Sequence, residues 1–203
     1  LYFPCCYSSY DPRLKKVARA TATILNKAGV NYGILGSKEN CCGESIRKTG
    51  DEGLFKKLAK ENIKTFVDNG VSKIVVSSPH CYQAFKNDYA QFKVNFEVVH
   101  ISQYLFDLVR EGRIEFKKDF AKRVTYHDPC YLGRHNGVYD EPRGVLSKIP
   151  GLKLTEMADY RSDSLCCGGG GGRVWMETPK SERFSDIRID QALEVGAQVL
   201  ATS

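Results

Sequence analysis

Short apolar runs alternate with amphipathic segments along the whole chain. Apolar residues recur at helical spacing up to Gly29 and again up to Gly70, and glycine is common directly after a helix. Runs rich in β-branched residues, such as Lys73–Ser77, have the composition of strands buried in a parallel sheet. The expected strands are 1–4, 32–35, 73–77, 96–100, 124–127 and 198–201, and the expected helices are 14–28, 55–67, 102–110, 142–148 and 181–195. One face of the last helix is expected to contain Ile189, Ala192, Leu193 and Gly196. This alternation predicts an α/β fold with parallel sheets and right-handed crossovers.

The same motifs occur twice in the same order. Pro4–Arg13 contains Cys-Tyr, then Tyr-Asp and Pro-Arg, and Asp128–Arg143 contains them again. A Cys-Cys-Gly follows each copy, after 34 residues counted from Cys6 and after 35 counted from Cys130. Two unrelated sites would not be expected to share this order and spacing, so we interpret the chain as an internal duplication.

The duplication predicts two pseudo-repeated Cys-Cys-Gly domains, each a small, mostly parallel sheet with flanking helices. The charged segment Arg113–Lys122 lies where the two copies should join. We place the first domain at residues 1–118 and the second at residues 119–203, and we expect the second to be C-terminally incomplete. The chain begins without Met and is interpreted as a piece of a longer polypeptide.

Composition and charge exclude several classes of protein. No apolar run approaches the roughly 20 residues that cross a bilayer, and no secretory signal opens the chain. We therefore expect a cytoplasmic protein, associated with a membrane only through other parts of its parent protein. The net charge of +6 is mild, and the basic residues form no single tract and no nucleic-acid-binding motif. No nucleic-acid partner is expected.

The eight cysteines carry the strongest chemical signal. They are Cys5, Cys6, Cys41, Cys42, Cys81, Cys130, Cys166 and Cys167, and six of them form three adjacent pairs. Adjacent cysteines rarely form a disulfide with each other, and a chain of this length without a secretory signal argues against a disulfide framework. Metal or redox chemistry is the favoured use, and a set of buried free thiols is the alternative.

Thiolates select zinc or iron–sulfur clusters. Zinc sites usually draw on short Cys-x-x-Cys spacings, whereas this chain combines vicinal pairs with cysteines tens of residues away. Neighbouring thiolates can bind different irons of one cluster more easily than they can share one tetrahedral zinc. An iron–sulfur cluster of several irons is therefore the expected cofactor, with zinc as the alternative.

In these motifs the chain resembles the cysteine-rich Cys-Cys-Gly-domain iron–sulfur oxidoreductases. This family includes heterodisulfide reductase subunits of the B and D types, the glycolate oxidase iron–sulfur subunit and electron-transfer-flavoprotein-linked oxidoreductases. Its motif is a cysteine, a long spacer, Cys-Cys-Gly, a second long spacer and Cys-x-x-Cys. The resemblance implies cluster ligands at Cys6, Cys41, Cys42 and Cys81 in the first copy and at Cys130, Cys166 and Cys167 in the second.

The chain departs from the family motif at two places. The first Cys-x-x-Cys reads Ser78-Pro-His-Cys81, which removes one thiolate and leaves Ser78 or His80 near the vacancy. The second Cys-x-x-Cys would begin directly after Ser203. Cys5 lies outside the motif and is interpreted as a packing thiol beside the site or as a substitute ligand.

The resemblance implies an iron–sulfur electron-transfer module whose cofactor is a [4Fe-4S] cluster, cubane or non-cubane. It would pass electrons between a flavoprotein, or another electron-transfer subunit, and a quinone, a disulfide or a further cluster. With one thiolate fewer, the first centre is expected to relay electrons or to be structural, and the second to perform the terminal transfer. The alternative is a zinc-stapled structural or docking module without redox activity. Candidates for accessory roles, each with an ordinary structural role as its alternative, are His80, His127, His135, Arg47, Arg134 and Arg173.

Overall fold

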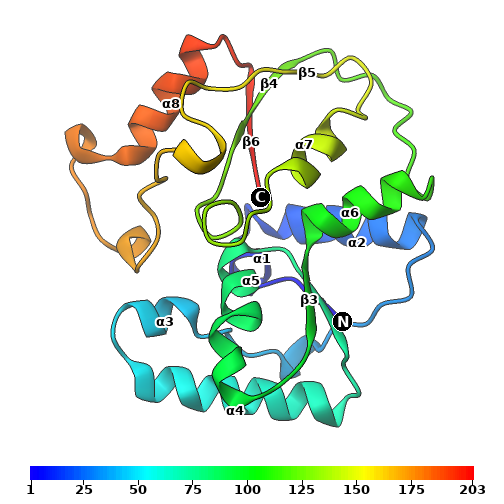
Figure 1. Cartoon of the computed structure of the whole chain (residues 1–203), viewed down its shortest axis with the longest axis vertical. Helices are drawn as coiled ribbons and strands as arrows, with labels where there is room; N and C mark the ends of the chain where they lie inside the picture. The colour runs from blue at the N-terminus through cyan, green and yellow to red at the C-terminus, as the bar shows by residue number, and fades with distance from the viewer. The chain divides into compact units, whose positions relative to one another are not determined.

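The chain folds into two compact units. The computed structural model describes residues 1–203, and the units are Leu1–Ile114 and Glu115–Ser203, coloured from blue to green and from green to red in Figure 1. Each unit contains a three-stranded sheet in which all neighbouring strands are parallel. The predicted α/β class, with two small parallel sheets and flanking helices, is confirmed.

The sheet of the first unit has the strand order β1–β2–β3. These strands are β1 (Tyr2–Phe3), β2 (Lys73–Val76) and β3 (Glu97–His100). The helices of this unit are α1 (Cys6–Tyr10), α2 (Lys15–Lys27), α3 (Glu44–Lys48), α4 (Glu52–Asp68), α5 (Pro79–Lys86) and α6 (Ile101–Arg110). Because β1 and β2 are parallel neighbours, the segments that follow them leave the sheet at the same edge.

Aromatic side chains fill the core of the first unit. Phe3 packs edge to face on Phe85 and Phe66, with ring centroids 4.9 and 6.3 Å apart. Phe85 also meets the ring of Tyr89 at 5.0 Å. Burial of rings of this size contributes strongly to the stability of so small a sheet.

The predicted strand at residues 32–35 is wrong. This segment has no ladder of its own, although the backbone N–H of Tyr2 donates to the carbonyl of Gly33 at 2.9 Å. The ring of Tyr32 packs edge to face on Tyr2, with centroids 6.1 Å apart. The apolar pattern therefore marked a segment that packs beside β1 without forming a regular strand.

The sheet of the second unit has the strand order β5–β4–β6. Its strands are β4 (Arg123–His127), β5 (Lys153–Leu154) and β6 (Val199–Thr202), and its helices are α7 (Asp140–Leu146) and α8 (Phe184–Glu194). The segments after β4 lead to Cys130, as the segments after β1 lead to Cys6. The same strand-then-cysteine arrangement thus occurs in both units.

Helix α8 buries a different face from the expected one. Ile189 and Leu193 are 48% and 64% exposed, whereas Arg188 is buried next to Ala192. The Arg188 guanidinium donates to His127 Nδ1 at 3.2 Å and to the carbonyl of Asp159 at 2.9 Å. These polar partners hold Arg188 against the sheet and turn the apolar residues outward.

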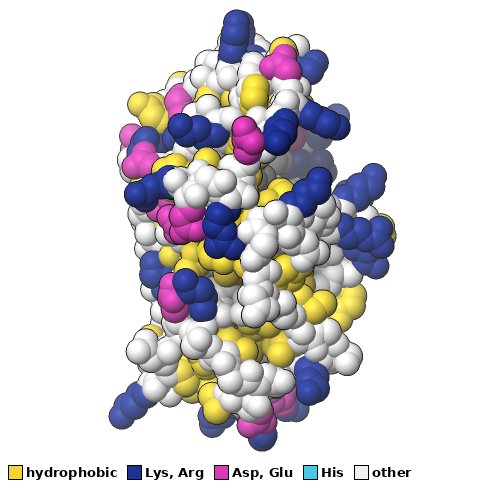
Figure 2. Space-filling view, turned by 90° about the vertical axis from the view of Figure 1, so that its right-hand side faces the viewer, with side chains coloured by type: hydrophobic (Ala, Val, Ile, Leu, Met, Phe, Trp, Pro, Cys, Tyr) yellow, Lys and Arg dark blue, Asp and Glu magenta, His cyan; other side chains and the backbone are white.

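The surface matches the mild charge of the sequence. Figure 2 shows Lys and Arg side chains scattered over one face, with apolar side chains visible between them. No helix combines the length and the apolar composition that a membrane crossing requires.

Gly43, the glycine of the first Cys-Cys-Gly, precedes α3 and adopts a left-handed conformation with φ of 81°. A Cβ atom at this position would lie 2.9 Å from Cδ2 of Phe55, a fully buried ring. Both the backbone and the space therefore require glycine. Gly168 of the second copy has the same conformation, with φ of 78°.

A buried ion cluster holds the turn after β4. The Arg143 guanidinium donates to both carboxylate oxygens of Asp128, at 2.6 and 2.7 Å, and to Glu156 at 2.7 and 2.9 Å. Asp128 is 3% exposed and also accepts the backbone N–H of Arg161. Because Asp128 lies two residues before Cys130, this cluster positions that cysteine.

We expect Gly43→Ala to destabilise the first unit more than Gly70→Ala does. Both glycines have positive φ, so each substitution costs about 1–2 kcal/mol through its backbone. Only Gly43 faces a buried ring; nothing lies within 4 Å of a Cβ at Gly70. Crowding should add about 1–3 kcal/mol at Gly43. Denaturant unfolding of the two apoproteins measures the difference, and equal losses would contradict this account.

We expect Arg143→Met to lower the free energy of unfolding of the second unit by about 3–5 kcal/mol, because it leaves Asp128 buried without its counter-charge. Arg161→Met is the matched control, since that side chain pairs with Asp140, whose side chain is 78% exposed. Loss of such a surface pair should cost less than about 1 kcal/mol. Urea titration of each variant provides the test, and a small loss for Arg143→Met would show that the cluster is not structural.

Candidate metal centre

Three segments of the first unit bring five thiols together. Cys5 and Cys6 follow β1, and Cys81 lies in the first turn of α5, which follows β2. Cys41 and Cys42 lie in the loop before α3. Cys5, Cys42 and Cys81 are at most 5% exposed. The parallel pairing of β1 and β2 explains why cysteines far apart in the sequence meet at one edge of the sheet.

The five thiols form a closed ring in which each sulfur interacts with two others. In order around the ring they are Cys5, Cys6, Cys41, Cys42 and Cys81, and Cys81 returns to Cys5. The Sγ atoms of Cys42 and Cys81 are 3.4 Å apart. The four cysteines expected to converge do so, and Cys5 lies between Cys6 and Cys81.

Two buried side chains hold the backbone of the vicinal pair. The Asn62 amide donates to the carbonyl of Cys41 at 2.9 Å and to the Tyr89 hydroxyl at 3.0 Å. That hydroxyl donates to the carbonyl of Cys42 at 3.1 Å. Asn62 and Tyr89 are both fully buried. The two peptide carbonyls therefore point into the core, where their partners fix them.

The thiols of the ring differ in acidity. Hydrogen bonds from neighbouring thiols lower the pKa of Cys5 to about 3 and the pKa of Cys41 to about 2. Hydrogen bonds to neighbouring sulfurs, together with burial, raise the pKa values of Cys6, Cys42 and Cys81. The backbone N–H of Gly43 also donates to the Cys41 sulfur at 3.4 Å.

The surroundings of Cys5 include a carboxyl group. Burial, followed by the charge of Cys5, raises the pKa of Glu39 to about 7, and a bond to the backbone of Cys5 opposes this. Glu39 lies with Cys6 and Cys41 along a pocket of about 400 Å³. The ring is therefore reached from one side, while the core covers Cys42 and Cys81.

The two residues expected near the missing thiolate behave differently. The Ser78 hydroxyl caps α5, accepting the backbone N–H of His80 at 3.2 Å, and it interacts with the Cys5 thiol. His80 Nδ1 lies 2.8 Å from the carboxylate of Glu44, which is 1% exposed. Ser78 is therefore beside the ring, and His80 belongs to a separate pair in which Glu44 is buried and His80 is partly exposed.

The second unit brings three thiols together. After burial, the charges of Cys166 and Cys167 raise the pKa of Cys130, and Arg134 opposes this effect. The Cys166 sulfur accepts the backbone N–H of Gly168 at 3.3 Å, as Cys41 accepts that of Gly43. The two Cys-Cys-Gly motifs thus share their local bond as well as their left-handed glycine. Unlike Cys42, both cysteines of this pair are exposed.

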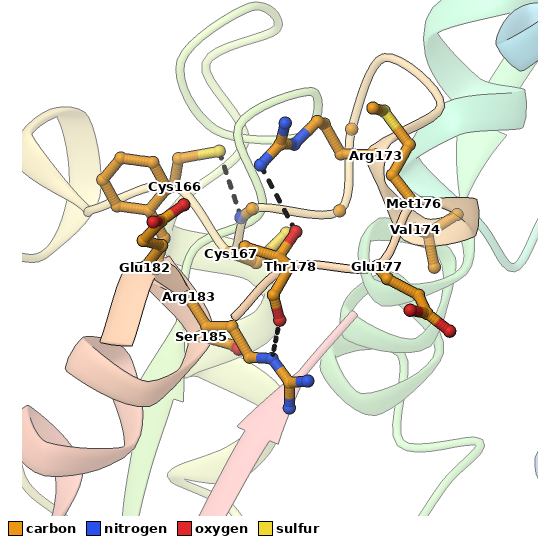
Figure 3. A pocket seen from close by; sticks show the side chains of 14 residues that line it. Cys166, Cys167, Arg173, Val174, Met176, Glu177, Thr178, Glu182, Arg183 and Ser185 are labelled. Atoms are coloured by element: carbon orange, nitrogen blue, oxygen red, sulfur yellow. Dashed lines mark hydrogen bonds between the residues drawn. The ribbon is translucent and has the colours of Figure 1, made fainter. Parts of the chain in front are cut away.

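A cavity of about 600 Å³ opens beside Cys166 and Cys167. Figure 3 shows both cysteines, with Arg173 and Arg183 each bonded to Thr178. Apolar side chains complete the wall; they are Val174, Met176 and Phe184. Backbone atoms line one side of this cavity, because Gly168, Gly169 and Gly170 have no side chains.

The remaining candidates have structural partners. The Arg47 guanidinium bonds Glu52 and Asp88, and Arg134 donates to the carbonyls of Ser162 and Ser164. Burial, followed by the charge of Arg188, lowers the pKa of His127 to about 4, and the ring of His135 packs against Tyr131. No set of three or more His, Cys, Asp or Glu side chains is arranged to hold a single metal ion.

The chain matches one family model in both units and has relatives among known proteins. The model, described as a cysteine-rich domain, matches residues 1–86 and 124–203. The EtfAB:quinone oxidoreductase of Syntrophomonas wolfei is 42% identical over the whole chain, which covers 29% of that protein. The probable iron–sulfur-binding oxidoreductase FadF of Bacillus subtilis is 43% identical, again over the whole chain and 29% of the protein.

A third relative is a subunit of a heterodisulfide reductase. The D-type subunit of the dihydromethanophenazine:CoB–CoM heterodisulfide reductase of Methanosarcina barkeri is 36% identical over the whole chain. The chain covers 51% of that protein, so it spans about half the length of this relative and less of the two above. The family model, these identities and the repeated thiol sites agree. The chain belongs to the cysteine-rich Cys-Cys-Gly-domain family of iron–sulfur oxidoreductases and carries two copies of the domain.

Proposed function

We propose that this chain is the iron–sulfur electron-transfer module of an oxidoreductase. It passes electrons between a flavoprotein and a quinone, a disulfide or a further cluster. The observation that carries the proposal is the closed ring of thiols in the first unit, which joins three segments of the chain at one sheet edge. A second group of thiols with the same Cys-Cys-Gly geometry supports it.

The donor set fits a cluster of several irons. Soft thiolates select iron–sulfur clusters or zinc, and a single zinc takes four ligands. The ring contains five sulfurs, and four of them belong to two vicinal pairs, Cys5-Cys6 and Cys41-Cys42. The proposed ligands of the first centre are Cys6, Cys41, Cys42 and Cys81, and those of the second include Cys130, Cys166 and Cys167. A [4Fe-4S] cluster, when bound, supplies one-electron redox chemistry.

The protein's own residues set the conditions for that chemistry. The core keeps water from Cys42 and Cys81, which are 5% and 1% exposed. The N–H groups of Gly43 and Gly168 donate to Cys41 and Cys166, and such bonds to sulfur stabilise negative charge and raise the reduction potential. Ligand binding requires each thiol to lose its proton.

The relatives support the kind of partner. One relative is named as an EtfAB:quinone oxidoreductase, and another as part of a heterodisulfide reductase. A probable membrane-anchored ferredoxin of Chromohalobacter salexigens is 37% identical over 93% of the chain and 29% of that protein. We therefore infer a flavoprotein or another electron-transfer subunit as partner, in the cytoplasm or on the cytoplasmic face of a membrane complex. The cavity beside Cys166 and Cys167 is the proposed place of the terminal transfer.

We expect the full-length protein, purified without oxygen, to be brown and to contain about four irons and four sulfides per occupied site. Cys42→Ala should remove the iron of the first centre and leave that of the second, because the substitution deletes a proposed ligand of the first centre alone. Metal analysis and visible absorption spectra measure both outcomes. Ser45→Ala is the matched control, since it changes a small side chain next to the same loop without removing a thiol.

A colourless protein with one zinc per chain would contradict the proposal. So would a Cys42→Ala protein that keeps all of its iron. Removal of iron with a chelator should bleach the native protein and abolish electron transfer from the flavoprotein to the acceptor.

A further inference from the structure

We propose that Cys5 is a fifth thiolate ligand of the first centre and takes the place that Ser78 leaves without a sulfur. This inference rests on the proposed function, because it concerns the same cluster. The family motif does not include Cys5, and the adjacent pair Cys5-Cys6 is the only signal for it in the sequence.

Cys5 is a full member of the thiol ring. Its sulfur interacts with those of Cys6 and Cys81, and no other thiol joins these two. Without Cys5 the ring would therefore open between the end of β1 and the start of α5. A packing thiol beside the site would touch the ring from outside rather than link two of its members.

The Cys5 sulfur also lies where the missing thiolate is expected. It interacts with the hydroxyl of Ser78, the residue that stands at the first cysteine position of Cys-x-x-Cys. The Cys5 sulfur, which comes from the segment after β1, thus lies close to the position where a cysteine in place of Ser78 would have its sulfur. The site would then have five thiolates drawn from Cys5, Cys6, Cys41, Cys42 and Cys81.

The backbone of Cys5 is strained in a way that a packing role does not require. Its φ is 78° and its ψ is 153°, a region that is essentially confined to glycine. Neighbouring side chains ordinarily point to different sides of an extended chain, yet the Cys5 and Cys6 thiols interact. The strained conformation accompanies this unusual convergence, and a bond from sulfur to iron would offset its cost. A small apolar side chain in an ordinary conformation would fill the same space at no such cost.

The ligand step is a simple exchange. The Cys5 thiol releases its proton to solvent, and its sulfur forms one bond to iron without any change in oxidation state. Under this proposal the first centre has as many thiolate ligands as a complete family motif supplies. The number of thiolates therefore no longer predicts a higher reduction potential at the first centre than at the second.

The strained backbone suggests the substitution that tests the proposal. Cys5→Gly removes the thiol and places in that conformation the residue that best tolerates it, so the protein should still fold. The experiment uses the full-length protein carrying Cys166→Ala and Cys167→Ala, so that the second centre of this chain does not contribute to the signals. Circular dichroism and thermal unfolding establish that each variant is folded, and Cys5→Ala provides a second variant.

We expect Cys5→Gly to lower the iron retained after anaerobic desalting at least twofold. The iron that remains should give an electron paramagnetic resonance signal that differs from that of the parent protein. Adding Ser78→Cys to Cys5→Gly should restore most of the iron and the parent signal, because a sulfur returns beside the ring. Loss of bulk alone would not be rescued by a thiol on another segment.

A folded Cys5→Gly protein with the iron content and signal of its parent would overturn the inference. Cys42→Ala in the same background separates this outcome from failure of the proposed function. If Cys42→Ala loses its iron while Cys5→Gly keeps it, the site is a cluster site and Cys5 is not a ligand. If Cys42→Ala also keeps its iron, the proposed function itself is wrong.

Discussion

The arrangement of the first site depends on how the peptide of Cys41 and Cys42 is held. Vicinal thiols can join one ring only if their backbone is fixed, because free rotation would turn one of them away. Asn62 and Tyr89 bind the two carbonyls from inside the core, and Gly43 supplies the left-handed turn that follows. An unpartnered carbonyl at this depth would cost about 1–3 kcal/mol, so the polar partners are as necessary as the aromatic packing around them.

In the second unit, buried charge fixes a different cysteine, the one that follows the central strand. Cys130 is positioned by Asp128, whose carboxylate is held by Arg143 and by a backbone N–H. Buried polar contacts thus fix the vicinal pair in the first unit and the strand-end cysteine in the second. Loss of a partner from such a cluster is strongly destabilising, so the position of Cys130 depends on buried contacts even though Cys166 and Cys167 are exposed.

Much of this arrangement could be predicted from the sequence, and the failures have physical causes. The β-branched runs and the repeated cysteine spacing predicted parallel strands with thiols at their ends, because both signals are local. The segment 32–35 has the apolar pattern of a strand, but it packs beside β1 without forming one. The backbone N–H of Tyr2 donates a hydrogen bond to the carbonyl of Gly33 in this segment. The outward turn of Ile189 depends on the partners of Arg188, which no periodicity reveals. The place of Cys5 depends on a backbone conformation that sequence patterns assign to glycine.

The strand register also determines where the chain can change in length. Tyr2 lies opposite Val75 and Phe3 opposite Val76, so the heights of Cys6 and Cys81 above the sheet are set by residues counted from the strand ends. One inserted residue there would shift a sulfur by about 3.3 Å, nearly the whole distance between neighbouring sulfurs. Cys6 follows the end of β1 by three residues, and Cys130 follows the end of β4 by three. The spacers to the Cys-Cys-Gly motifs are 34 and 35 residues long, so the single-residue difference between the copies falls in the spacer and leaves the distance from strand to cysteine the same in both units.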